Sequence, residues 1–311
     1  MKWYRRSGWP GYGLWAVWLV WAVRPMPAWG GERAADAAPL NLRIAVSENV
    51  AGELNGSDAR AAMKAWADAV SRQTGVLIEP ELCTTAQLVQ KVRSRQVDAF
   101  SVDILEFERV SAYAARELVV EQANLEDAQQ YVLLVHQSSG IRSLADLRGR
   151  SLLIYRNRSM CLARIWLDTL LGAARLGATE TLIGHLDSSP KLTRVVLPVF
   201  FRQTDACLVT RKAFATMCEL NPQLGKELHP LEVSAKVIVA FLAFHKDSPA
   251  ELKRRFLGAI EDLHKSVEGR QALMLFGGSH LVRADTSVLQ SSFEMLHAYA
   301  RLRGREPAGG Q

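Results

Sequence analysis

Four consecutive polar residues have the composition of an anion-binding loop. Arg156, Asn157, Arg158 and Ser159 lie between a short apolar run and a segment with helical spacing of apolar residues. An anion at the start of a helix meets free backbone N–H groups and the positive end of the helix dipole. The two guanidinium groups would add charged donors, and Asn157 or Ser159 would cap the helix. The alternative is an ordinary helix cap flanked by two solvated arginines.

Other polar residues occupy the same kind of position, at the ends of predicted strands. A second loop contains Ser188, Ser189 and Lys191, with a proline near the first turn of the helix that follows. In the first part of the chain the equivalent positions hold Ser47, Asn49, Ser101 and Asp103. Because α/β proteins bind ligands at the carboxyl ends of their strands, we expect these residues to face one another across a cleft. Simple capping loops remain the alternative.

Asp205 is a third candidate, at the start of a predicted strand. Beside an anion site, its carboxylate would accept a proton from a partly protonated oxyanion or pair with an amine. Otherwise Asp205 is only a turn residue.

The sequence patterns of common enzyme sites are absent after residue 30. There is no GxSxG, GxxxxGK[ST], HExxH or strand-linked GxGxxG. The seven histidines are scattered, with no i, i+4 pair to bind a metal. We therefore predict a protein that is not an enzyme and that needs no cofactor.

The elements that must position these residues alternate between strands and helices. Strands are expected at 42–46, from 76 and at 98–102. Helices are expected at about 58–74 and 104–114, and between them Thr84 or Thr85 caps a helix that carries Leu88, Val89 and Val92. This order predicts an α/β fold with a mainly parallel, doubly wound sheet.

A second α/β pattern lies between two nearly all-apolar strands, 131–135 and 237–242. If those strands are paired hinge crossings, residues 133–236 form a second lobe. The first lobe then comprises 41–132 plus 237–300, helical from about 248, and 301–311 form a flexible tail.

The first thirty residues belong to a different physical class, because they contain six of the eight tryptophans. Basic residues precede the ten-residue apolar run LWAVWLVWAV, which has the length of a secretory signal and spans about half of a bilayer core. We predict a signal peptide over residues 1–30 and a periplasmic protein, with an uncleaved anchor as the alternative. Removing this segment lowers the formal charge from +6 to about +2, which argues against nucleic acid as a partner.

The four cysteines form no CxxC motif. In an oxidising compartment an even number permits disulfides, and buried free thiols are the alternative. The residues concerned are Cys83, Cys161, Cys207 and Cys218.

Several segments of the chain resemble the substrate-binding proteins of phosphate/phosphite/phosphonate ABC transporters. They are 140–150 (GIRSLADLRGR), 199–207 (VFFRQTDAC), 219–224 (ELNPQL) and 269–276 (GRQALMLF). The resemblance implies a two-lobed type II periplasmic-binding-protein fold, with two doubly wound sheets, a two-strand hinge and the ligand in the inter-lobe cleft. It further implies that the loop around Asn157 and Ser159 holds the oxyanion and that Asp205 is an acidic contact.

The chain departs from the family pattern at several of these positions. Arginines replace part of a Ser/Thr-rich loop, residues 188–191 lack a histidine that some relatives have, and Asn49 and Val102 stand where aromatic contacts are expected.

Together these features predict an extracytoplasmic solute-binding protein that captures a small oxyanion for an ABC importer. The alternative is a periplasmic sensory module that signals to a membrane receptor or kinase. The expected partners are a small anionic ligand and an ABC permease or membrane receptor.

Overall fold

A computed structural model describes residues 40–51, 56–121, 129–275 and 280–304. The predicted signal peptide and all but the first residues of the predicted tail lie outside these ranges. Among the described residues, no helix has the length and apolar character that a membrane span requires.

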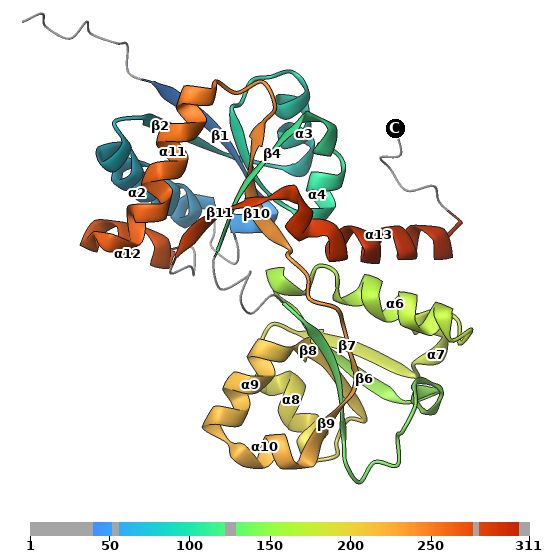
Figure 1. Ribbon diagram of the computed structural model, residues 1–311. Helices are drawn as coiled ribbons and strands as arrows, with labels where there is room; N and C mark the ends of the chain where they lie inside the picture. Colours follow the sequence, from blue (N-terminus) through green and yellow to red (C-terminus); the bar gives the residue numbers. More distant parts are fainter. Residues whose placement is uncertain (1–39, 52–55, 122–128, 276–279, 305–311) are drawn as a thin grey trace, which may run out of the picture. The chain divides into compact units, whose positions relative to one another are not determined.

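The first sheet has six strands in the order β11-β4-β10-β3-β1-β2 (Figure 1). β1 pairs in parallel with β2 and β3, while β10 runs antiparallel to β3 and β4, and β11 antiparallel to β4. The strands are β1 (Asn41–Ser47), β2 (Leu77–Cys83), β3 (Ala99–Asp103), β4 (Ala114–Glu121), β10 (Ala240–His245) and β11 (Leu281–Asp285).

Helices cover both faces of this sheet. Alternate residues of β1 explain why: Leu42 and Ile44 pack into the core formed with α2 and α11, whereas Ala45 packs into the core formed with α3 and α4. The helices are α1 (Glu48–Ala51), α2 (Gly56–Thr74), α3 (Thr85–Arg93), α4 (Ile104–Glu108), α11 (Ala250–Asp262) and α12 (Val267–Leu275).

The second sheet has five strands in the order β7-β6-β8-β5-β9. β6 pairs in parallel with β7 and β8, and β5 runs antiparallel to β8 and β9. The strands are β5 (Tyr131–His136), β6 (Ser151–Tyr155), β7 (His185–Ser189), β8 (Ala206–Thr210) and β9 (Leu228–Val233).

This sheet also carries helices on both faces. Residues of α6 pack against one face of β5, and residues of α8 and α9 pack against the other. The helices are α6 (Ala163–Ala173), α7 (Thr179–Leu182), α8 (Thr193–Phe200), α9 (Arg211–Leu220) and α10 (Pro222–Glu227). Between β5 and β6 the chain forms a 3-10 turn at Leu144–Leu147.

The chain crosses between the sheets at two neighbouring segments. Gln129 forms an isolated antiparallel bridge with Val237, whose N–H lies 2.8 Å from the Gln129 carbonyl oxygen. The two apolar strands themselves do not pair with each other, because β5 belongs to the second sheet and β10 to the first. β10 begins at Ala240, whereas the sequence predicted a strand from 237.

Two sequence predictions are wrong. Both sheets are mixed, not mainly parallel: β10 enters the first sheet antiparallel to β3, and β5 runs antiparallel to β8 and β9 in the second. The chain is also not helical throughout 248–300, since β11 interrupts it and pairs with β4. The sequence of β4, AARELVVE, contains strong helix formers, and the pairing with β10 and β11 overrides that local preference.

The last helix, α13 (Gln290–Leu302), packs along α6 (Figure 1). The Leu302 side chain lies directly against Gly172 of α6, where a Cβ atom would make it shift. Near its start, the Ser292 hydroxyl bonds with both the N–H and the carbonyl oxygen of Ile238, next to the crossing. All four cysteines are unpaired thiols in the structure.

Candidate functional site

The loops that follow β6 and β7 lie side by side. Parallel pairing places Tyr155 opposite Ser189 at the ends of the two strands. The Arg156 N–H donates to the Ser189 carbonyl oxygen at 2.9 Å, and the Ser189 hydroxyl accepts from the Lys191 N–H at 3.2 Å. The structure therefore brings two of the predicted loops together into one group, which comprises Arg156, Asn157, Arg158, Ser159, Ser188, Ser189 and Lys191.

The first of these loops, residues 156–162 (the Asn157 loop), is not a simple helix cap. A 3-10 turn, Arg158–Met160, follows Asn157, and α6 begins only at Ala163 with no side-chain cap. The prediction that Asn157 or Ser159 caps this helix is therefore wrong. Instead, Asn157 Oδ1 is buried and has no hydrogen-bond partner within the described part of the chain. A buried polar atom of this kind indicates a place where a water molecule or a ligand completes the hydrogen bonding.

The arginines of the loop extend from it in exposed positions. Arg156 and Arg158 are both exposed, and Arg158 Nη1 donates to the Val50 carbonyl oxygen of α1 at 3.2 Å.

Cys161 follows the same turn. Burial and the charge of Asp103 raise the pKa of the Cys161 thiol to about 12. This thiol stays protonated at neutral pH and is no nucleophile.

The strand-end residues of the first sheet surround a carboxylate that sequence reasoning missed. Glu106, buried in α4, accepts hydrogen bonds from the Ser47 hydroxyl at 2.7 Å and from the Thr85 hydroxyl at 2.6 Å. Asp103 caps the same helix, and its Oδ1 accepts from the Glu106 N–H at 2.8 Å. The D-x-x-E spacing of a capping box was the signal that would have found Glu106.

This network shows what the first-sheet residues do within the protein. Burial raises the pKa of Asp103, and the neighbouring charge of Glu106 adds to the increase. Asn49 is exposed in α1, and Ser101 is half-buried inside β3 opposite Leu242. Ser47 and Asp103 thus stabilise the strand ends through their bonds with Glu106.

Asp205 lies apart from the loops after β6 and β7 and from the network around Glu106. It lies next to Ser151 at the amino ends of β8 and β6, about 15 Å along a five-residue strand from the Asn157 loop. Its carboxylate accepts from the Ser151 N–H at 2.8 Å, from the Ser151 hydroxyl at 2.6 Å and from Arg150 Nη1 at 3.3 Å. Burial opposes ionisation of Asp205, but the bonds from Ser151 and the charge of Arg150 outweigh it and lower the pKa. Asp205 is a structural residue that joins two strands.

Replacing Asp205 with asparagine is therefore expected to lower stability without weakening ligand binding. Loss of the charge-assisted bonds should cost about 1–3 kcal/mol and lower the unfolding midpoint by several degrees. Thermal unfolding and ligand titration of Asp205→Asn check both parts. A marked loss of affinity would restore Asp205 to the site.

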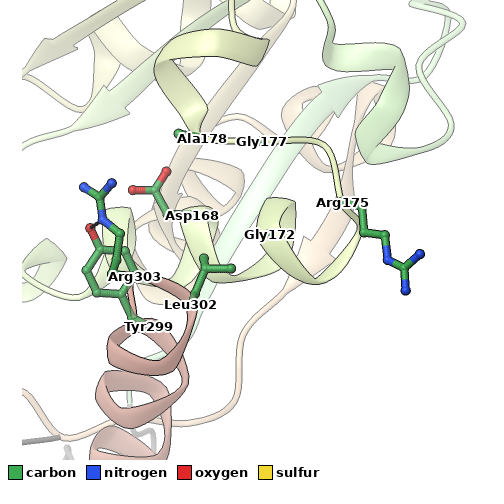
Figure 2. A pocket seen from close by; sticks show the side chains of 8 residues that line it. All are labelled: Asp168, Gly172, Arg175, Gly177, Ala178, Tyr299, Leu302 and Arg303. Carbon is green, nitrogen blue, oxygen red and sulfur yellow. Dashed lines mark hydrogen bonds between the residues drawn. The ribbon is translucent and has the colours of Figure 1, made fainter. Parts of the chain in front are cut away.

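A cavity of about 360 Å³ lies near the carboxyl ends of α6 and α13 (Figure 2). Asp168, Tyr299 and Arg303 lie close together at this cavity, while the Arg175 side chain points away. Arg303 Nε donates to the Tyr299 hydroxyl at 3.1 Å, and Asp168 Oδ1 accepts from the Thr179 N–H at 3.1 Å. These polar groups bond within the protein, and the cavity lies toward the opposite end of α6 from the Asn157 loop.

A protein-family comparison decides what kind of protein carries this arrangement. Residues 53–289 match the family described as ABC transporter, phosphonate, periplasmic substrate-binding protein. The chain belongs to this family. As a member of the phosphonate-binding family it is a periplasmic substrate-binding protein, not an enzyme, and it works with a small ligand and a membrane permease. No curated protein matches the chain significantly.

Solved structures support the fold of this phosphonate-binding family member. PhnD1 from Prochlorococcus marinus, in complex with methylphosphonate, is 13% identical, with 86% of this chain and 99% of that chain covered and a TM-score of 0.55. A binding protein component of an ABC phosphonate transporter from Pseudomonas aeruginosa is 12% identical, with coverages of 85% and 89% and a TM-score of 0.53. XAC2383 from Xanthomonas citri, bound to ATP, is 15% identical, with coverages of 85% and 98% and a TM-score of 0.58. The shared architecture is the two-lobed type II periplasmic-binding-protein fold.

Two of the motifs shared with the phosphonate-binding family lie away from the strand-end loops. Asp146, in the segment 140–150, accepts hydrogen bonds from the N–H groups of Arg142 and Ser143 and so closes the turn before β6. Asp205, in the segment 199–207, holds the start of β8 against β6. Both segments thus contribute hydrogen bonds to the scaffold of the second sheet.

Proposed function

We propose that this member of the phosphonate-binding family captures a small phosphorus oxyanion (phosphate, phosphite or a phosphonate) at the loops after β6 and β7. The observation that carries the proposal is that Arg156, Arg158 and Lys191 belong to two adjoining strand-end loops. One of these loops contains Asn157, whose Oδ1 is buried without a hydrogen-bond partner among the described residues. Guanidinium groups are well suited to phosphorus oxyanions because their planar donors form charge-assisted hydrogen bonds. Methylphosphonate in the related PhnD1 structure supports the ligand class.

The charge distribution along the chain favours the same assignment. Residues 131–236, which contain the second sheet, have fourteen basic and eight acidic residues, a formal charge of +6. Residues 40–130 have nine basic and fourteen acidic residues, a formal charge of −5. An anion approaching the protein is therefore attracted to the part that contains the Asn157 loop.

The expected hydrogen bonds are sufficient for useful affinity. Micromolar binding requires about −8 kcal/mol. Hydrogen bonds to a charged group contribute about 1.5–3 kcal/mol each, so a few of them can offset the cost of association once water is excluded. We propose that the ligand lies between the two lobes and that movement at the crossings near 129–131 and 234–237 closes them around it. The closed form then delivers the ligand to the permease.

A stability screen tests this function directly. The full chain is unfolded by heat with millimolar phosphate, phosphite, methylphosphonate or sulfate, with sodium chloride at equal ionic strength as the control. A ligand at about 100 times its Kd should stabilise the protein by about 2.7 kcal/mol, which is about 4–5 °C at this size. No shift with any phosphorus oxyanion would overturn the proposal.

A further inference from the structure

The conformation of the Asn157 loop depends on a residue outside it. Tyr131, the first residue of β5, is fully buried. Its hydroxyl donates to the Ser159 carbonyl oxygen at 2.9 Å. One phenol group therefore holds the 3-10 turn that precedes α6.

This contact anchors a segment that has no side-chain cap of its own. The start of α6 carries no side-chain cap. The Tyr131 hydroxyl instead fixes the preceding turn from a different strand, through the Ser159 carbonyl oxygen. Its ring also packs against Trp166, one turn into α6, with 6.1 Å between ring centroids. Burial raises the pKa of Tyr131, so the phenol keeps the proton that it donates.

The backbone of the same residue is held at the crossing between the sheets. The Tyr131 N–H donates to the Ser234 hydroxyl at 2.8 Å, and the Ser234 N–H donates to the Tyr131 carbonyl oxygen at 2.9 Å. The bridge between Gln129 and Val237 lies beside this pair. Tyr131 therefore connects both crossing segments to the loop.

We infer that Tyr131 is the positioning residue of the oxyanion site: it sets the conformation of residues 157–162 and ties that conformation to the crossing between the lobes. The inference rests on the proposed function for the part that concerns ligand affinity. Its structural part, the ordering of the loop, applies with or without a ligand. Tyr131 acts through the loop and does not itself contact the anion.

The test compares Tyr131→Phe with Asp205→Asn in the full chain. The phenylalanine variant keeps the ring packing and loses only the hydroxyl, while the asparagine variant disturbs the opposite end of the same sheet. Amide hydrogen exchange across residues 156–166 and titration with inorganic phosphate and methylphosphonate are measured for both variants and for the unmodified protein.

Tyr131→Phe should accelerate exchange at residues 157–162 and weaken binding of whichever probe the unmodified protein binds by about tenfold. Asp205→Asn should leave both properties unchanged. Unchanged exchange in Tyr131→Phe, or equal acceleration in Asp205→Asn, would overturn the inference. If the unmodified protein binds neither probe, the proposed function fails, and the exchange measurement still decides the role of Tyr131.

Discussion

Arg156→Ala is expected to bind the oxyanion about 10- to 100-fold more weakly than the unmodified protein, because each charge-assisted hydrogen bond contributes about 1.5–3 kcal/mol. The substitution removes the guanidinium group but keeps the hydrogen bond that the Arg156 N–H donates to the Ser189 carbonyl oxygen. Stability should change little, since the side chain is exposed. Isothermal titration with phosphate and methylphosphonate measures the effect.

Arg148→Ala is the matched control for charge. Arg148 is also exposed and belongs to the same lobe, but it lies before β6, at the end of the strand opposite to the Asn157 loop. Both substitutions lower the net charge by one, so a general electrostatic effect would weaken binding equally. Equal losses in the two variants, or full affinity in Arg156→Ala, would contradict the assigned site.

Glu106→Ala is expected to cause the largest loss of stability, about 3–5 kcal/mol. Truncation leaves the hydroxyls of Ser47 and Thr85 and the N–H of Asp103 without their acceptor in a buried region. For a protein of this size the unfolding midpoint should fall by about 5–8 °C. Thermal and denaturant unfolding measure the change.

Glu108→Ala provides the comparison within the same helix. Glu108 is half-buried two residues after Glu106, and its substitution should change stability by less than about 1 kcal/mol. If both variants unfold at similar temperatures, the buried network around Glu106 contributes less than its hydrogen bonds indicate.

Much of the fold was predictable because its signals are local. The strand ending at Ser47 and the helix capped by Thr84 follow from apolar periodicity and capping residues, both of which act within a few positions. The strands β4 and β11 were not predictable in this way. Their local composition is ambiguous, and pairing with distant strands determines their conformation.

The candidate site was likewise predictable only where its signals are local. Residues 156–159 and 188–191 were predicted as neighbours because both follow parallel strands, and the register of β6 with β7 brings them together. Glu106 was missed because a glutamate in a helix is ordinarily exposed. Its burial depends on Ser47, 59 residues away in the sequence.

The sequence by itself determined the α/β class, the strand-end loops and the likeness to the phosphonate-binding family, because periodicity, capping and motifs are properties of neighbouring residues. Only the tertiary structure decided that Asp205 lies at the opposite end of its strand from the Asn157 loop and that Tyr131 supports this loop. The physical reason is that strand register and the contact from Tyr131 to Ser159, 28 residues apart, form only when the whole sheet packs against α6.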